Sequence, residues 1–456
     1  MEQFEVGIDG SSIVAVATAP GTGGIAVVRV SGKDAIKIVD SAWKGASLVK
    51  ADSHTVHLGK YVSTAGDVLD ECVATVFRAP NSFTGENIVE LGLHGSRWIQ
   101  REVVADLIRR GARGADRGEF TRRAFMNGRL DLAQAEGVAD LIAASSKAAH
   151  ALAMSQTRGA FSRGLDEVRE KLVEFAALLE LELDFSEEDV EFADRTRLKE
   201  LAKGLLARLD RLAASYSSGA ALKEGVPVVI AGIPNAGKSS LLNLLLGDDK
   251  AIVSDIPGTT RDTIEDTAEI DGVLFRFIDT AGLRATTDTV ENLGIDRARA
   301  KMRRARIVIW IFDPTAEEAP QEEEYGKFAS ENPDVEVIRV VGKGDKITAS
   351  PLSKGMLMSM KSGEGLDTLR QRLTASATGG YDPQSEFIVT NARHYEALLR
   401  SGEALRRALE GLESNLSADF IAQDVREATH HLGTITGAVT TDTLLHHIFQ
   451  NFCIGK

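Results

Sequence analysis

The sequence has very little cysteine and no long hydrophobic run. Its 456 residues contain two cysteines, Cys72 and Cys453, which excludes a disulfide framework and a zinc site held by cysteines. The longest apolar run, Ile307 to Phe312, has the length of a strand, whereas a membrane helix needs roughly 20 apolar residues. The first ten residues carry acids where a secretory signal would carry Lys or Arg. We therefore expect a cytoplasmic protein with no membrane-spanning segment.

The sequence also lacks an excess of basic residues. It has 67 acidic and 53 basic side chains, for a formal net charge of -14. Nonspecific nucleic-acid binding depends on many Lys and Arg residues that neutralise phosphates. The protein surface as a whole is therefore not expected to bind nucleic acid nonspecifically, although a local basic patch is compatible with this net charge.

The length predicts two to four domains, because a domain takes roughly 100 to 200 residues. Short β-branched runs and one helix fill residues 1–127, and Ala, Leu, Glu and Arg at helical spacing fill 128–222. Strands and helices alternate over 223–380, and a helical pattern resumes over 381–456. The predicted fold class is a multidomain α/β and α protein, in which an α/β domain is inserted into a helical bundle that follows an N-terminal α/β domain.

A phosphate-binding motif lies at the start of the inserted domain. The strand Val226 to Ala231 is followed by Gly232 to Ser239, GIPNAGKS, and then by the helical run Leu241 to Leu246. This is GxxxxGK[ST] in its strand-to-helix context. Backbone N–H groups of such a loop surround the β-phosphate, Lys238 supplies charge to the β and γ oxygens, and Ser239 can ligate Mg²⁺.

Later segments supply the other parts of a nucleotide site. Asp279 to Gly282, DTAG, follows the strand Val273 to Ile278 and can serve the Mg²⁺ shell and the γ-phosphate. In the loop between the two motifs, the Thr260 hydroxyl can complete the Mg²⁺ ligands. Guanine needs a carboxylate that accepts from its N1–H and 2-amino groups, and Asp345 in the run Gly342 to Asp345 offers one.

Three further stretches point to a family. They are PNSFTGE (Pro80 to Glu86), GEFTRRAFMNGRLDLAQAE (Gly118 to Glu136) and FCIGK (Phe452 to Lys456). Together with the GTPase motifs, they resemble the family of tRNA-modification GTPases called MnmE or TrmE, over nearly the whole chain. The resemblance implies hydrolysis of GTP coupled to addition of an aminomethyl-type (carboxymethylaminomethyl) group to C5 of the wobble uridine of certain tRNAs.

The resemblance also implies cofactors and partners. The N-terminal domain is similar to a folate-binding fold that mediates homodimerisation, with 5-formyl-tetrahydrofolate as the one-carbon source. A flavin-dependent partner of the MnmG (GidA) type would complete a heterotetramer that acts on tRNA. K⁺ would take the place of an arginine finger, and two GTPase domains would pair for hydrolysis.

The residues that the family assigns to hydrolysis can be placed one by one. Leu283 follows DTAG where many small GTPases carry a water-orienting Gln, and the family's catalytic Glu corresponds to Glu291. Arg261 is a second catalytic candidate. The Mg²⁺ ligands would be Ser239 and Thr260, and the K⁺ ligands Asn235, Ser254, Ile256 and Thr259. The predicted GTP contacts are Asn235, Ala236, Gly237, Lys238, Ser239, Ser240, Ser254, Asp255, Ile256, Pro257, Gly258, Thr259, Thr260, Asp279, Thr280, Ala281, Gly282, Gly342, Lys343, Gly344, Asp345, Ser359, Met360 and Lys361.

One position departs from the family pattern. The guanine motif of the family is NKxD, and here Gly342 stands where the Asn is expected. A side-chain amide that braces the P-loop and the base is therefore missing. We expect GTP to be preferred still, but to bind more weakly than with Asn.

The folate contacts implied by the resemblance are Arg29, Glu90, Arg129 and Lys456. Arginine and lysine suit the glutamyl carboxylates, and Glu90 suits the N–H donors of the pterin. Without the family, Arg29 and Glu90 would be taken for structural or surface charges. Cys453 is a catalytic candidate through the FCIGK match, and a role as nucleophile or in structural positioning stays open.

Two segments concentrate arginine and lysine. They contain Arg101, Arg109, Arg110, Arg113, Arg117, Arg122, Arg123 and Arg129, and then Arg297, Arg299, Lys301, Arg303, Arg304 and Arg306. Either segment can contact tRNA phosphates, or it can form solvated helix faces and salt bridges. The alternative function is a regulatory or ribosome-assembly GTPase switch, which would need neither the FCIGK tail nor a folate site.

Overall fold

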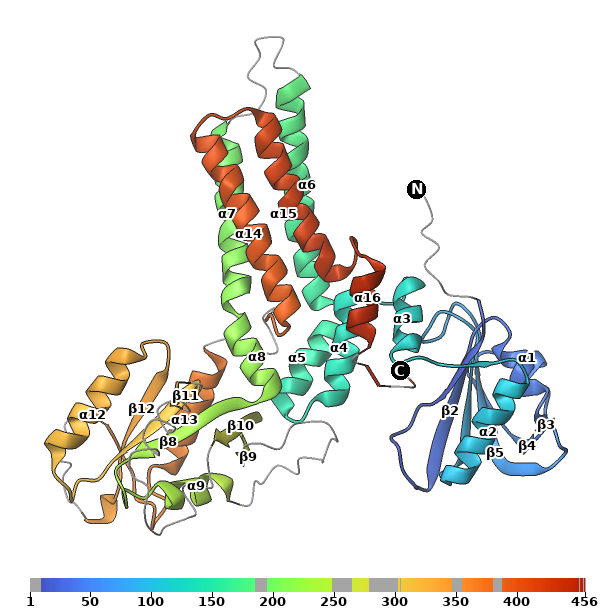
Figure 1. The fold of residues 1–456 in the computed structure, drawn as a ribbon, viewed down its shortest axis with the longest axis horizontal. Helices are drawn as coiled ribbons and strands as arrows, with labels where there is room; N and C mark the ends of the chain where they lie inside the picture. Colours follow the sequence, from blue (N-terminus) through green and yellow to red (C-terminus); the bar gives the residue numbers. More distant parts are fainter. Residues whose placement is uncertain are drawn as a thin grey trace. The chain divides into compact units, whose positions relative to one another are not determined.

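The structure is a computed structural model that describes residues 10–184, 195–247, 265–278, 302–303, 305–346, 355–379, 388–450, 452–453 and 455 (Figure 1). The chain divides into two compact units. The first is Met1–Ala139 with Gly433–Lys456, and the second is Asp140–Leu432. The predicted boundaries after residues 127, 222 and 380 describe a finer division, which stays a prediction. Among the described residues, no helix is long and apolar enough to cross a membrane.

The first unit is built on a seven-stranded sheet. Its strand order is β3-β4-β5-β6-β2-β1-β7, and every neighbouring pair is antiparallel except β1 and β7. The strands are β1 (Ile13–Val16), β2 (Ile25–Ser31), β3 (Trp43–Gly45), β4 (Thr55–Val62), β5 (Val68–Phe77), β6 (Ile88–His94) and β7 (Arg113–Gly114). Along β5, exposed or half-buried residues alternate with the buried Asp70, Cys72, Ala74 and Val76, and along β4 the exposed Val56, Leu58 and Lys60 alternate with half-buried residues, so one face of these strands is covered and the other is open.

Helices α1 (Ala35–Asp40) and α2 (Arg97–Arg109) contribute to the core of this sheet. Val103 and Leu107 of α2 are fully buried there, with Val30 and Leu91 of the sheet. A second cluster joins α3 (Glu119–Met126), α4 (Leu132–Ala143) and α16 (Asp442–Phe449). The end of the chain therefore belongs to the same compact unit as the N-terminal sheet.

The second unit combines long helices with a six-stranded sheet (Figure 1). The helices are α5 (Lys147–Thr157), α6 (Ala160–Asp184), α7 (Arg195–Ala214), α8 (Tyr216–Glu224), α14 (Ala392–Glu413) and α15 (Ala418–Thr436). The sheet has the order β13-β12-β11-β8-β10-β9. Its elements are β8 (Val226–Gly232), α9 (Lys238–Leu246), β9 (Glu265–Ile270), β10 (Val273–Ile278), β11 (Ile307–Phe312), α12 (Glu318–Glu331), β12 (Glu336–Val341), β13 (Met356–Leu357) and α13 (Leu366–Thr378).

The order of these elements matches an insertion. Helices α7 and α14 pack together although the whole α/β part lies between them in sequence. In the sheet, β10, β8, β11, β12 and β13 run parallel, and β9 is antiparallel to β10. The carboxyl ends of the parallel strands therefore meet at one edge, where ligands bind in folds of this kind.

Helix α2 is held to the first unit by a buried carboxylate, Asp106, which is 0% exposed. It accepts hydrogen bonds from Tyr61 Oη (3.0 Å), from Thr64 N and Oγ1 (both 2.9 Å) and from Arg110 Nε (2.7 Å). Burial acts to raise the pKa of Asp106, but the bonds from Arg110 and Thr64 outweigh it and hold the pKa well below its usual range. The carboxylate is therefore charged and fully partnered.

We predict that Asp106→Asn lowers the free energy of unfolding by about 3 kcal/mol, because Arg110 loses its buried partner. Urea unfolding of the full chain at pH 7 measures the change. A carboxyl with a depressed pKa stabilises above its unfolded pKa, so the difference from wild type shrinks as the pH falls below about 4. Asp34→Asn, at an exposed ion pair with Lys37, is the control and should change stability by less than about 0.5 kcal/mol. A difference that grows on acidification would contradict the assignment.

Candidate functional site

The P-loop leaves the middle of the six-stranded sheet at Gly232, the last residue of β8. Gly232 has φ +137°, and a Cβ there would lie 2.4 Å from the carbonyl oxygen of Ile311 on β11. No residue with a side chain fits this position. Asn235 (φ +63°) and Gly237 (φ +102°) are also left-handed, so the loop curls back before α9 begins at Lys238.

Lys238 lies in the curl of the loop. Its Nζ donates hydrogen bonds to the carbonyl oxygens of Gly232 (2.7 Å) and Ile233 (2.8 Å). Burial lowers the pKa of the Lys238 ammonium. The amine thus reaches back over the loop to its first residues, and a loop of this kind holds the phosphates of a nucleotide with its lysine and its backbone N–H groups.

The predicted guanine loop lies at the same edge of the sheet. It follows β12 and is fixed by backbone bonds from Gly342 N to Phe312 O and from Gly344 N to Met358 O, each 2.9 Å. Asp345 accepts a hydrogen bond from the buried Ser359 hydroxyl at 3.4 Å. These contacts bring together two segments that the sequence assigned separately to the base.

Lys343 is held by a buried carboxylate on the neighbouring strand end. Its Nζ forms an ion pair with Asp313, which follows β11. Burial acts to raise the pKa of Asp313, but hydrogen bonds from Lys343 and Thr315 outweigh it and keep the pKa low. Sequence reasoning missed Asp313, and its only signal is a carboxylate directly after an apolar strand.

Gly342, the first residue of the guanine loop, faces the P-loop. A Cβ at this position would be 3.2 Å from the carbonyl oxygen of Ala236 and 3.5 Å from Cε of Met360. Met360 also lies 3.7 Å from a Cβ built at Gly237. A side chain at residue 342 would therefore point into the gap between the two loops, where Met360 now provides the contact.

Many predicted site residues lie outside the described residues. They are Ser254, Asp255, Ile256, Pro257, Gly258, Thr259, Thr260, Arg261, Asp279, Thr280, Ala281, Gly282, Glu291 and Lys456. In sequence, β9 begins at Glu265, four positions after Arg261, and β10 ends directly before Asp279. The described part of the nucleotide site comprises Asn235 to Ser240, Gly342 to Asp345 and Ser359 to Lys361.

In the first unit, the structure pairs Arg29 on β2 with Glu90, its register neighbour on β6. Both Nε and Nη2 of Arg29 lie 2.8 Å from Oε1 of Glu90. The guanidinium also lies over the rings of Phe83 (5.5 Å) and Phe120 (5.6 Å). Both charged side chains are partly exposed, at 18% and 27%, so they are accessible at the surface of the sheet.

Arg129 and the described part of the tail lie on the same unit. The Cγ of Arg129 lies 3.2 Å from a Cβ built at Gly85, in the loop that carries Phe83. Gly455 is buried, and a Cβ there would lie 2.2 Å from the carbonyl oxygen of Val16 on β1. The carbonyl of Cys453 accepts a bond from Gly118 N at 3.3 Å, and the Cys453 side chain is exposed.

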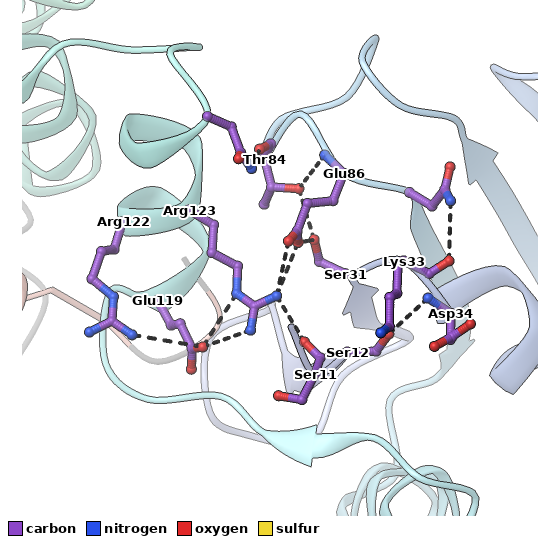
Figure 2. Close-up of polar contacts among 12 residues, drawn as sticks. Ser11, Ser12, Ser31, Lys33, Asp34, Thr84, Glu86, Glu119, Arg122 and Arg123 are labelled. Carbon is purple, nitrogen blue, oxygen red and sulfur yellow. Dashed lines mark hydrogen bonds and ion pairs between the residues drawn. The ribbon is translucent and has the colours of Figure 1, made fainter. Parts of the chain in front are cut away.

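A buried ionic cluster connects two of the family stretches (Figure 2). Arg123 is 0% exposed; its Nη1 donates to Glu86 (3.1 Å) and to the carbonyl oxygen of Ser11 (2.9 Å), and its Nη2 donates to Glu119 (3.0 Å). Glu86 also accepts from the Ser31 hydroxyl at 2.7 Å. The cluster ties the PNSFTGE loop to α3 beside the Arg29 site.

The arginines of the first arginine-rich segment fall into two groups, those paired with buried carboxylates and those exposed to solvent. Arg110, Arg113 and Arg123 pair with the buried carboxylates Asp106 and Glu119, so salt bridges account for them. Arg101 and Arg109 are largely exposed, at 70% and 53%. A phosphate-binding role on this segment is therefore restricted to its exposed members.

The glycine-rich loop between a buried parallel strand and a helix, with a lysine in its curl and a Lys-x-Asp loop at the same sheet edge, defines a P-loop nucleotide-binding protein. Residues 132–453 match the family model for the MnmE helical domain, and residues 12–129 match that for the GTP-binding protein TrmE N-terminus. The chain belongs to the MnmE (TrmE) family.

Named relatives match over nearly their full length. The chain is 50% identical to the tRNA modification GTPase MnmE of Parabacteroides distasonis, over 98% of this chain and 100% of that protein. It is 47% identical to the protein of the same name from Flavobacterium johnsoniae, with coverage of 98% and 100%. A solved structure of a variant of Aquifex aeolicus Era bound to GDP.AlF4- is similar over 39% of this chain and 66% of that chain, with 26% identity and a TM-score of 0.26.

We predict that Gly342→Asn tightens GTP binding by about fivefold, because the added amide can bridge the two loops and one hydrogen bond contributes about 1 kcal/mol. Calorimetric titration of GTP and of ATP measures this. Gly342→Ala adds the Cβ without the amide and should not tighten binding. Equal affinities of the unaltered protein for ATP and GTP would contradict the guanine assignment of Asp345.

Proposed function

We propose that this protein is a GTPase that acts in tRNA modification. The observation that carries the proposal is membership of the MnmE family over 98% of the chain, joined to a complete P-loop at Gly232 to Ser239. Its relatives carry the name tRNA modification GTPase. Within a complex, the protein supports addition of a carboxymethylaminomethyl-type group to C5 of the wobble uridine of certain tRNAs.

In this proposal, GTP hydrolysis uses the P-loop edge of the sheet. Lys238 and the N–H groups at the start of α9 hold the phosphates, and Ser239 and Thr260 ligate Mg²⁺. Glu291 orients the attacking water, and Asn235 with Ser254, Ile256 and Thr259 holds K⁺ when two GTPase domains pair. Asn235 has a left-handed φ of +63°, which asparagine adopts more readily than most residues. The loop therefore holds the Asn235 backbone in one conformation, which supports its proposed role as a K⁺ ligand.

The proposed folate site lies on the first unit. Oε1 of Glu90 lies 2.8 Å from both Nε and Nη2 of Arg29. Among the described residues none donates to Oε2 of Glu90, which suits an N–H donor of a pterin. Phe83 and Phe120 beside Arg29 offer the aromatic surface that a pterin stacks on. Arg129 and Lys456 would take the glutamyl carboxylates, and the folate, 5-formyl-tetrahydrofolate, supplies one carbon.

The exposed face of the first sheet supports a homodimer. Leu58 is 69% exposed, and its register neighbour Val73 is 38% exposed. Ile25 and Val56, at 73% and 62%, extend the apolar surface over β2 and β4. An exposed apolar sheet face of this kind is usually covered by a partner, which we propose is a second copy. A flavin-dependent partner of the MnmG (GidA) type completes the proposed heterotetramer.

The tail tests whether this is a tRNA-modifying enzyme or a regulatory switch. We predict that deletion of residues 453–456 abolishes the wobble modification while GTP turnover is retained, because the described tail residues Cys453 and Gly455 contact the first unit, whereas the P-loop belongs to the second. Mass spectrometry of tRNA nucleosides from complemented cells reads out the modification. Cys453→Ser, which keeps the tail, separates loss of the thiol from loss of packing. Full modification without the tail would favour a regulatory or ribosome-assembly GTPase.

We predict that GTP turnover in KCl exceeds turnover in NaCl of the same ionic strength by roughly 10-fold or more, since a group that faces transition-state charge contributes on the order of 10²- to 10³-fold. Asn235→Gly, which keeps the left-handed backbone and removes the side-chain oxygen, should abolish most of this difference while nucleotide binding is retained. Steady-state phosphate release measures both. Identical turnover in the two salts would count against the K⁺ assignment.

A further inference from the structure

Helix α2 presents an exposed tryptophan to solvent. Trp98 is 53% exposed, whereas Trp43 and Trp310, the other tryptophans of the chain, are 8% and 3% exposed. The opposite side of the helix carries Val103 and Leu107, which are buried in the core of the sheet. The helix, which lies along the sheet in Figure 1, therefore packs through its other side and does not use Trp98 for packing.

Arginines surround Trp98 on this face of α2. Arg97, Arg101 and Arg109 are all exposed, and Ile108 is 45% exposed. At about 100° per residue, these positions fall within roughly 120° of one another around the helix. Arg97 and Arg109 are about 18 Å apart along the axis, which is long enough to follow several phosphates of one strand. We call Arg97, Trp98, Arg101, Ile108 and Arg109 the α2 face.

The positive charge of the α2 face is not cancelled by its own helix. The buried carboxylate of Asp106 is paired with Arg110 at 2.7 Å and with Arg109 at 3.3 Å. Because one negative charge faces two positive ones, one positive charge is left over on this part of the helix. Glu102 is the partly exposed carboxylate of the helix, 31% exposed and 3.2 Å from Arg101. Among the described residues, no ion pair is recorded for Arg97. A chain with a net charge of -14 therefore has a local basic stripe here.

We propose that the α2 face binds a single-stranded part of the substrate tRNA. Trp98 stacks on an unpaired base, and Arg97, Arg101 and Arg109 contact phosphates on either side. Stacking on an aromatic side chain requires no particular base, and basic residues beside it follow the backbone. Tryptophan and arginine are also common in protein interfaces, but here the three arginines are spread over about 18 Å of one helix face, a spacing that can follow a phosphate backbone. The inference rests on the proposed function, because tRNA is the RNA that this function supplies.

The position of Trp98 gives a direct readout. Intrinsic fluorescence of the full-length protein should be quenched on titration with tRNA, because Trp98 is the exposed indole among the three. In Trp98→Phe this change should be lost, and in Trp98→Ala binding should weaken by about tenfold. The charge is tested with the double variant Arg97→Ala/Arg101→Ala. Each lost phosphate contact to a single strand should lower the slope of log affinity against log salt by about 0.7, and the double variant by about 1.4.

The controls separate this surface from the rest of the protein. Arg426→Ala, at a position on α15 that is 62% exposed, removes an equally exposed arginine and should bind tRNA as the unaltered protein does. GTP turnover should be the same in all variants, because α2 lies in the unit without the P-loop.

Two outcomes overturn the inference and leave the proposed function intact. One is unchanged affinity and salt slope in the α2 variants while the unaltered protein binds tRNA. The other is loss of dimer or partner assembly in sedimentation with tRNA binding unchanged, which would make the α2 face a protein interface. If the unaltered protein binds no tRNA, the inference also fails, and failure of the proposed function is then judged separately by nucleoside analysis of the tail deletion.

Discussion

The apolar core of the GTPase sheet extends beyond the sheet into the helices that precede and follow it. Val228 and Ile230, from the strand that leads into the P-loop, share one buried cluster with Leu152 of α5, Leu222 of α8 and Ile388. An inserted domain with a separate core would be free to turn on its two connections. Here the strand that positions Lys238 and the helices beside the sheet are packed in a single core, so neither can shift without disturbing the other.

Backbone contacts reinforce this shared core. A Cβ on Gly219 of α8 would lie 2.1 Å from the carbonyl oxygen of Val389, so the helix and the returning chain touch through main-chain atoms. The turn between β9 and β10 accepts a 2.9 Å bond at Gly272 O from Ala148 N of α5. This hairpin connects, in sequence, the two segments predicted to contact Mg²⁺ and the γ-phosphate. A displacement of the hairpin would have to break its bond to α5 or carry the helix with it.

Local patterns predicted the strands and helices of the nucleotide site well. The predicted strands Val273 to Ile278 and Ile307 to Phe312 coincide with β10 and β11, and the predicted strand before the P-loop differs from β8 by one residue. Apolar runs of this length next to Gly-rich turns are strong local signals. The ionic pairing of the first unit could not be predicted in this way. Arg123 finds Glu86 across 37 positions of sequence, and a local concentration of arginines looks the same whether its partners are buried carboxylates or phosphates.

Contacts between distant residues could not be predicted at Gly342 either. The sequence shows that an amide is missing there, but not which side chain fills its place. In the structure, the guanine loop keeps its backbone bonds to β11 and to Met358, and Lys343 is anchored by Asp313. Met360 contacts the positions of both loops that an amide would join. The thioether is apolar and flexible, so it fills the space without fixing the two loops by a directed bond. The loss of the amide should therefore be felt in the affinity for the base, while the fold of the loop is retained by contacts that do not involve residue 342's side chain.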